Sequence, residues 1–136
     1  MKTIVLGYDD SPEAGRALDR VAQLAPALGA RVLVASIAPA LQPVGRGIGP
    51  YDPADPPERY RELAQNAAAT LADGGVTAEP VSGLGEAGTA IVSLADEHGA
   101  DLIVVGMSHH QHVSRFLGGV SEDVAHHARC DVLLVR

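Results

Sequence analysis

Residues 4–12 read Ile4-Val5-Leu6-Gly7-Tyr8-Asp9-Asp10-Ser11-Pro12, a short apolar run followed by acidic residues and a helix-start signal. The run at 4–8 predicts a strand that is buried on both faces. Ser11 is placed to cap a helix whose first residue is Pro12, and the apolar spacing carries this helix to Leu28, where Gly29 ends it. A strand that leads directly into a helix is the repeating unit of α/β proteins.

The rest of the chain repeats this alternation. We expect strands at 31–37, 76–82, 102–105 and 132–135, and helices at 58–73, 86–98 and 119–127. Such alternation predicts an α/β fold, a doubly wound five-stranded parallel sheet with helices on both faces. Pro80 cannot donate a ladder hydrogen bond, so the strand at 76–82 should lie at a sheet edge, which suits the strand order 3-2-1-4-5. The Pro- and Gly-rich segment 39–57 is expected to be a loop, either a lid or an insertion.

Length and composition predict a single domain over residues 1–136. Its 46% hydrophobic and 3% aromatic content indicates an aliphatic core. The net charge of −7, with Lys2 as the only lysine, argues against nucleic acid as a partner. Neither a signal peptide nor a membrane span is expected, which predicts a cytoplasmic location. Cys130 is the only cysteine and is expected to fill space in the core.

Two segments are predicted to meet at the carboxyl end of the sheet. In the order 3-2-1-4-5 the chain reverses direction between its first and fourth strands, and ligands bind at the strand ends that flank such a point. Those ends carry Asp9-Asp10 and the loop that follows Gly106. Gly106 and Gly118 bracket this loop, and the free N–H groups of the helix that begins near Gly119 favour an anion. The sequence therefore predicts a site for a phosphorylated ligand.

Four segments resemble the universal stress protein family, and together they span essentially the whole chain. These segments are Ile4–Glu13, Leu102–Gly106, Leu117–Glu122 and Val132–Val135. The resemblance implies the five-stranded order given above, a dimer and, in one branch of the family, bound ATP, with Mg²⁺ accompanying the nucleotide. It identifies the chain as a stress-response regulator rather than a turnover enzyme.

The resemblance also supplies the candidate nucleotide-binding residues. Asp9 matches the acidic residue that contacts the nucleoside in the family, and Ile37 falls where a residue of the second strand lines the adenine. The full set is Tyr8, Asp9, Ile37, Val105, Gly106, Ser108, His109, Gly118, Gly119, Val120 and Ser121.

The phosphate loop departs from the ATP-binding pattern in three ways. That pattern is Gly, two residues, Gly, nine residues, then Gly followed by Ser or Thr. Here His109 stands at the second glycine, the loop between Gly106 and Gly118 is one residue short, and Gly119 replaces the hydroxyl residue. A non-glycine residue in a left-handed conformation costs roughly 1–2 kcal/mol. Two functions therefore stay open beside ATP binding: a stress-response interaction module that binds no nucleotide, and a weak ATPase.

Other site types fit the sequence less well. His109, His110 and His112 are close together in sequence, but nothing indicates convergent geometry, so no metal site is expected. A phospho-receiver domain would need an Asp after the third strand and a Lys after the fifth, where this chain has Ser82-Gly83 and Arg136. No nucleophile motif of a hydrolase is present, and no catalytic residue is predicted.

The last strand is expected to form a homodimer interface. Residues 132–135 end the chain without a covering helix, which predicts an exposed sheet edge. Antiparallel pairing with a second copy across a two-fold axis closes such an edge.

Overall fold

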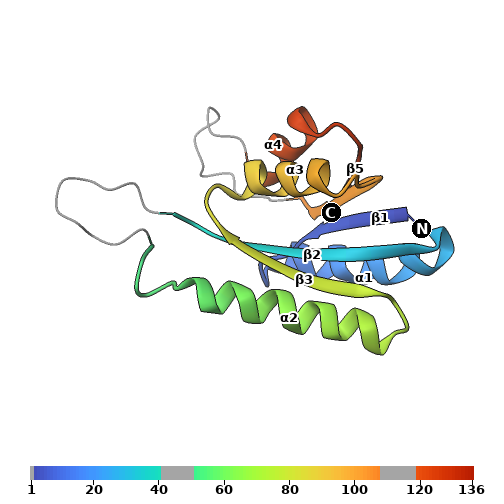
Figure 1. The fold of residues 1–136 in the computed structure, drawn as a ribbon, viewed down its shortest axis with the longest axis horizontal. Coiled ribbons are helices and arrows are strands. Elements are labelled where there is room, and N and C mark those ends of the chain that lie inside the picture. The colour runs from blue at the N-terminus through green and yellow to red at the C-terminus, as the bar shows by residue number, and fades with distance from the viewer. Residues whose placement is uncertain (1, 41–50, 108–118) are drawn as a thin grey trace.

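The computed structural model describes residues 2–40, 51–107 and 119–136, which form an α/β sheet protein (Figure 1). All strand pairs are parallel, and the strand order is β3-β2-β1-β4-β5. Figure 1 shows α1 and α2 on one face of the sheet and α3 and α4 on the other. The predicted fold class and strand order are confirmed. The elements are β1 (Lys2–Gly7), α1 (Pro12–Leu28), β2 (Ala30–Ala38), α2 (Pro57–Asp73), β3 (Ala78–Leu84), α3 (Ala87–Glu97), β4 (Leu102–Gly106), α4 (Val120–His127) and β5 (Asp131–Val135).

The core is built from two aliphatic layers, one on each side of the sheet. Alternate residues of β1 divide between them: Ile4 and Leu6 pack towards α1 and α2, and Val5 packs towards α3 and α4. All three side chains are at most 1% exposed. Because both faces of the central strands are covered, these strands are apolar throughout, as is usual for parallel sheets.

The third strand starts two residues later than predicted, at Ala78 instead of Val76. The backbone N–H of Val76 donates to the Leu71 carbonyl at 3.0 Å, as part of the turn that closes α2. Gly75 in this turn has φ +86°, a conformation that glycine adopts without strain. Val76 is therefore engaged with the end of the helix, and the ladder with β2 forms beyond it.

The predicted edge position of Pro80 is confirmed, since β3 ends the five-stranded sheet and, of the described strands, pairs only with β2. Of the predicted loop at 39–57, residues 41–50 lie outside the described part of the chain, and residues 51–56 form turns that lead into α2. Within the three described ranges, no helix combines the length and the apolar character needed to cross a membrane.

Candidate functional site

The carboxyl ends of β1 and β4 lie next to each other at the point where the strand order reverses, as predicted. The end of β1 is fixed to β2 by two hydrogen bonds of Tyr8. Its backbone N–H donates to the Ala35 carbonyl at 2.9 Å, and its carbonyl accepts from the Ser36 hydroxyl at 2.7 Å. Ser36 is completely buried. The chain therefore leaves the sheet from a well-defined point, and the residues that follow are Asp9 and Asp10.

Asp9 and Asp10 form a tight turn between β1 and α1. Asp9 Oδ1 accepts from the Ser11 backbone N–H at 3.0 Å, and the Ser11 hydroxyl caps α1 by accepting from the Ala14 N–H at 3.1 Å. Asp10 has φ +64° and is the only non-glycine residue with a left-handed backbone among those described. Aspartate tolerates this conformation better than most residues. The turn leaves Asp9 Oδ2 without a hydrogen-bond partner in the described structure.

Packing alone requires a glycine at position 106. A Cβ atom at this position would lie 2.4 Å from the backbone carbon of Glu13 and 2.5 Å from its carbonyl oxygen. The first turn of α1 therefore sits directly on the end of β4. The sequence interpretation assigned this glycine to close approach of a phosphate, whereas the structure gives it a role in packing that is independent of a ligand.

The predicted apolar and aromatic site residues lie on both faces of the sheet. Tyr8 packs at the edge of the α1/α2 layer, while Ile37 and Val105 pack in the α3/α4 layer. Val105 is only 3% exposed, so its side chain is not available to a ligand. Partial burial, together with the Asp10 and Asp9 carboxylates, raises the pKa of Tyr8, whose phenol therefore stays neutral.

The start of α4 presents backbone N–H groups at this edge. Gly119 is the N-cap, and no side chain caps the helix there. Val120 is 38% exposed, whereas Ser121 is buried. With respect to the described residues, the N-terminus of α4 therefore keeps the N–H donors and the positive dipole end that favour an anion. The predicted residues Ser108, His109 and Gly118 lie outside the described residues, as do His110 and His112 of the histidine cluster.

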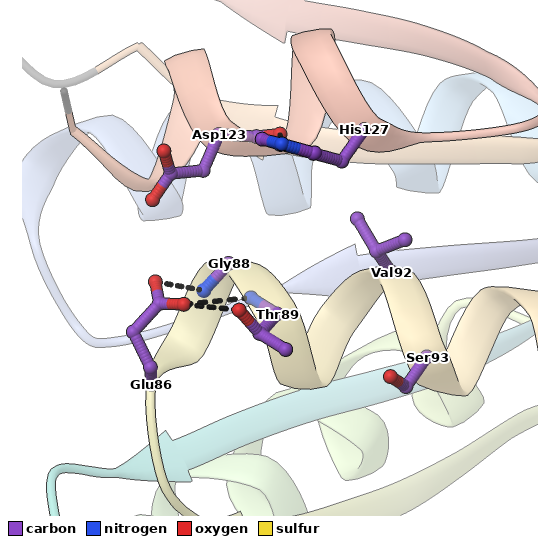
Figure 2. A pocket seen from close by; sticks show the side chains of 7 residues that line it. All are labelled: Glu86, Gly88, Thr89, Val92, Ser93, Asp123 and His127. Carbon is purple, nitrogen blue, oxygen red and sulfur yellow. Dashed lines mark hydrogen bonds between the residues drawn. The ribbon is translucent and has the colours of Figure 1, made fainter.

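The N-terminus of α3 is occupied by a carboxylate that the sequence analysis overlooked. Glu86 accepts hydrogen bonds from the backbone N–H groups of Gly88 and Thr89 at 3.2 and 3.3 Å, and from the Thr89 hydroxyl (Figure 2). Because this end of α3 binds its own acidic side chain, it is not available to an external anion. The spacing of Glu86 and Thr89 was the signal, but glutamate is an uncommon N-cap residue.

A groove of about 240 Å³ separates α3 from α4 beside this cap. The two helices approach closely because Gly88 has no side chain: a Cβ there would lie 2.8 Å from the Cβ of Asp123. The groove is lined by Glu86, Gly88, Thr89, Val92, Ser93, Asp123 and His127 (Figure 2).

The Glu86 cap gives a testable pH dependence. Replacing Glu86 by alanine is expected to lower the free energy of unfolding by about 1 kcal/mol at neutral pH, as for other side-chain caps. The hydrogen bond from the Thr89 hydroxyl and those from the two backbone N–H groups lower the pKa of Glu86, although partial burial opposes them. Because the pKa of Glu86 is lower in the folded than in the unfolded protein, its carboxylate stabilises the fold fully at pH values above the unfolded-state pKa. This stabilisation is lost as the pH falls through the folded-state pKa.

Urea denaturation of wild type and Glu86→Ala at several pH values checks this expectation. The stability difference should be constant near neutrality and shrink below about pH 4.5, the usual value for glutamate. The control is Glu97→Ala, which removes the same charge from the other end of α3. Equal losses for the two variants would contradict a capping role.

The described part of the site is more acidic than basic. Asp9 and Asp10 follow β1, and Glu122 and Asp123 lie in the first turn of α4. Across residues 2–40, 51–107 and 119–136, no group of three or more His, Cys, Asp or Glu side chains is arranged to hold a metal ion. These carboxylates oppose an anion at this edge, whereas the N-terminus of α4 favours one.

Cys130 lies away from this edge, half-buried against the α3/α4 layer. Burial, followed by the nearby Asp131 and Asp96 carboxylates, raises the pKa of its thiol. A protonated, partly buried thiol agrees with the predicted space-filling role.

Comparison with known proteins identifies the family. The model of the universal stress protein family matches residues 1–136. A universal stress protein of Thermus aquaticus is 38% identical over 138 residues, which cover 99% of this chain and 98% of that protein. A universal stress protein solved in complex with cAMP has a TM-score of 0.78 at 31% identity, covering 99% of this chain and 96% of the other. The structure from Archaeoglobus fulgidus in complex with dAMP has a TM-score of 0.76 at 27% identity, with 100% and 98% coverage. The chain therefore belongs to the universal stress protein family.

Proposed function

We propose that this chain binds an adenine nucleotide at the carboxyl edge of the sheet and acts as a regulator rather than as a turnover enzyme. The observation that carries the proposal is the uncapped N-terminus of α4, which lies at the same edge as the Asp9 turn. Family members that are 31% and 27% identical were solved with cAMP and dAMP, which supports an adenine nucleotide as the ligand class.

Each part of the nucleotide has a proposed partner. The Asp9 carboxylate accepts from the ribose hydroxyls, Ile37 packs against the adenine, and the backbone at Val105 and Gly106 borders the ligand. The N–H groups of Gly119, Val120 and Ser121 donate to the phosphates. Ser108, His109 and Gly118 complete the proposed set from the loop, and ATP with Mg²⁺ is the form that the family resemblance implies.

The helix N-terminus alone does not account for binding. It favours an anion by about 0.3–1 kcal/mol, whereas micromolar affinity requires roughly 8 kcal/mol. Most of the affinity must therefore come from contacts to the base and the ribose and from the loop. This distribution agrees with an acidic site that recognises the nucleoside more strongly than the phosphates.

Thermal unfolding in the presence of nucleotides tests the proposal. ATP with Mg²⁺, AMP and cAMP are added separately, with GTP as the control for base recognition. A ligand present at about a thousandfold over its Kd should stabilise the protein by about 4 kcal/mol. The supernatant of heat-denatured protein is also assayed for released adenine nucleotide. No stabilisation at millimolar concentrations and no released nucleotide would contradict the proposal and favour the interaction module.

We also propose that the chain forms a homodimer through residues 132–135. Among the described residues of one chain, β5 pairs only with β4, and Val132, Leu133 and Leu134 are half-buried. A half-covered apolar edge strand supports pairing with a second copy. The cytoplasmic location stays a prediction from the sequence.

A further inference from the structure

Arg59, in the first turn of α2, lies against the turn that carries Asp9. Its Nη2 atom lies 3.4 Å from Asp10 Oδ1 and 3.2 Å from Asp10 Oδ2, across 49 residues of sequence. Its Nη1 atom donates to Asp55 Oδ1 at 3.2 Å. The guanidinium group therefore bridges two carboxylates, one from the β1–α1 turn and one from the segment that leads into α2.

The orientation of Arg59 is itself fixed by its neighbours. The Tyr60 hydroxyl donates to the other oxygen of Asp55 at 2.7 Å. The Arg59 guanidinium carbon also lies 5.2 Å from the centre of the Tyr60 ring, within the range of a cation–π contact. The Arg59 side chain is thus held by the Asp55 carboxylate and the Tyr60 ring, so it loses less entropy when it binds a third group, Asp10.

Global stability does not explain this arrangement. The side chains of Arg59 and Asp10 are 44% and 49% exposed, and ion pairs with that exposure contribute little to folding. The pair acts instead on a local feature, because Asp10 is the described non-glycine residue with a left-handed backbone. The conformation of Asp10 directs Asp9, whose Oδ1 is bound to the Ser11 N–H while Oδ2 is left for a ligand.

We propose that Arg59 is a positioning residue of the nucleotide site: it holds the Asp10 carboxylate and thereby fixes the turn in which Asp9 faces the ligand. Arg59 also offsets part of the negative charge that Asp9 and Asp10 would together present to an anionic nucleotide. The inference rests on the proposed function and adds a residue that lies outside the predicted site.

Arg59→Ala is expected to weaken adenine nucleotide binding by about fivefold, near the upper end of the contribution of an exposed ion pair. The melting temperature should change little. The control Arg61→Ala removes the same charge from an exposed position two residues further along α2 and should leave the affinity unchanged. Arg59→Lys keeps the positive charge but lacks the two-pronged guanidinium group that can contact two carboxylates. It should therefore bind nucleotide more tightly than Arg59→Ala and less tightly than wild type.

The sharpest test repeats Arg59→Ala in an Asp10→Gly background. Glycine adopts the left-handed conformation without strain and carries no charge, so the turn no longer needs Arg59. We expect the single variant Asp10→Gly and the double variant Asp10→Gly/Arg59→Ala to bind nucleotide with the same affinity. If Arg59→Ala lowered the affinity equally in the wild-type and the Asp10→Gly backgrounds, the inference would be overturned, because Arg59 would then act on the ligand directly.

Amide hydrogen exchange separates this inference from the proposed function, because it needs no nucleotide. The Ser11 N–H, which is bonded to Asp9, should exchange about fivefold faster in Arg59→Ala than in wild type or Arg61→Ala, if the ion pair holds the turn closed. If the Ser11 N–H exchanged at the same rate in Arg59→Ala as in wild type, the inference would be overturned even if the protein binds nucleotide. If the Ser11 N–H exchanges faster in Arg59→Ala but the wild-type protein binds no nucleotide, the role of Arg59 in holding the turn would stand and the nucleotide site would be rejected.

Discussion

Gly106→Ala is expected to destabilise the protein by about 3 kcal/mol, the upper end of the usual cost of overpacking. The added methyl group would lie 2.4, 2.5 and 2.7 Å from the backbone carbon, the carbonyl oxygen and the Cβ of Glu13. Two of these atoms belong to the backbone of α1, so no rotation of a side chain relieves the contact. The first turn of α1 must move away from β4, and the buried residue Ala14 moves with it.

The matched control lies in the same helix. Gly15 has no atom within 4 Å of the position where a Cβ would be added, so Gly15→Ala introduces no clash. In a helix interior this replacement should stabilise the protein by roughly 0.5–1 kcal/mol. Urea denaturation of both variants should therefore give changes of opposite sign. A Gly106→Ala protein as stable as wild type would show that α1 does not pack on β4 as described.

The fold could be predicted from sequence because its signals are local and repeated. Short apolar runs alternate with amphipathic segments, and a parallel sheet with right-handed crossovers is the usual result of that alternation. Pro80 added one specific constraint, since a residue without an N–H fits only an edge strand. The start of the third strand was less predictable, because the N–H of Val76 donates to the Leu71 carbonyl at the end of α2 and is not free for the sheet.

The site was only partly predictable, because its contacts join residues that are far apart in sequence. Asp9 and the start of α4 follow from strand ends and helix starts, which are local signals. The ion pair between Asp10 and Arg59 spans 49 residues and has no sequence signature. The role of Gly106 was assigned to a ligand, because a contact between a strand end and the backbone of another element leaves no pattern beyond the glycine itself.

Leu134→Pro is expected to convert the proposed homodimer into a monomer while leaving the fold intact. The Val135 carbonyl accepts from the Met107 N–H at 2.6 Å, so the backbone polar groups of Val135 face β4. Because these groups alternate along a strand, those of Leu134 and Val132 face the outer edge. Proline at 134 therefore removes an N–H that has no role in the ladder with β4, and edge strands tolerate proline.

Two-fold symmetry doubles the effect of this substitution. In an antiparallel pair of β5 strands, the N–H of Leu134 in each chain would donate to the other chain, so one substitution removes two hydrogen bonds. At about 1 kcal/mol each, this loss weakens the dimer roughly 30-fold, and the proline ring further obstructs the approach of the second strand. Sedimentation analysis should give twice the mass of one chain for wild type and the mass of one chain for Leu134→Pro.

Leu134→Ala is the control, because it removes the same apolar side chain from the α3/α4 layer but keeps the backbone N–H. This variant should be less stable than wild type and still dimerise, since the edge hydrogen bonds remain. If Leu134→Ala were monomeric as well, side-chain packing rather than strand pairing would hold the two chains together. If Leu134→Pro stayed dimeric and folded, the interface would have to lie on another surface, and the edge of β5 would need a different explanation for its half-buried apolar residues.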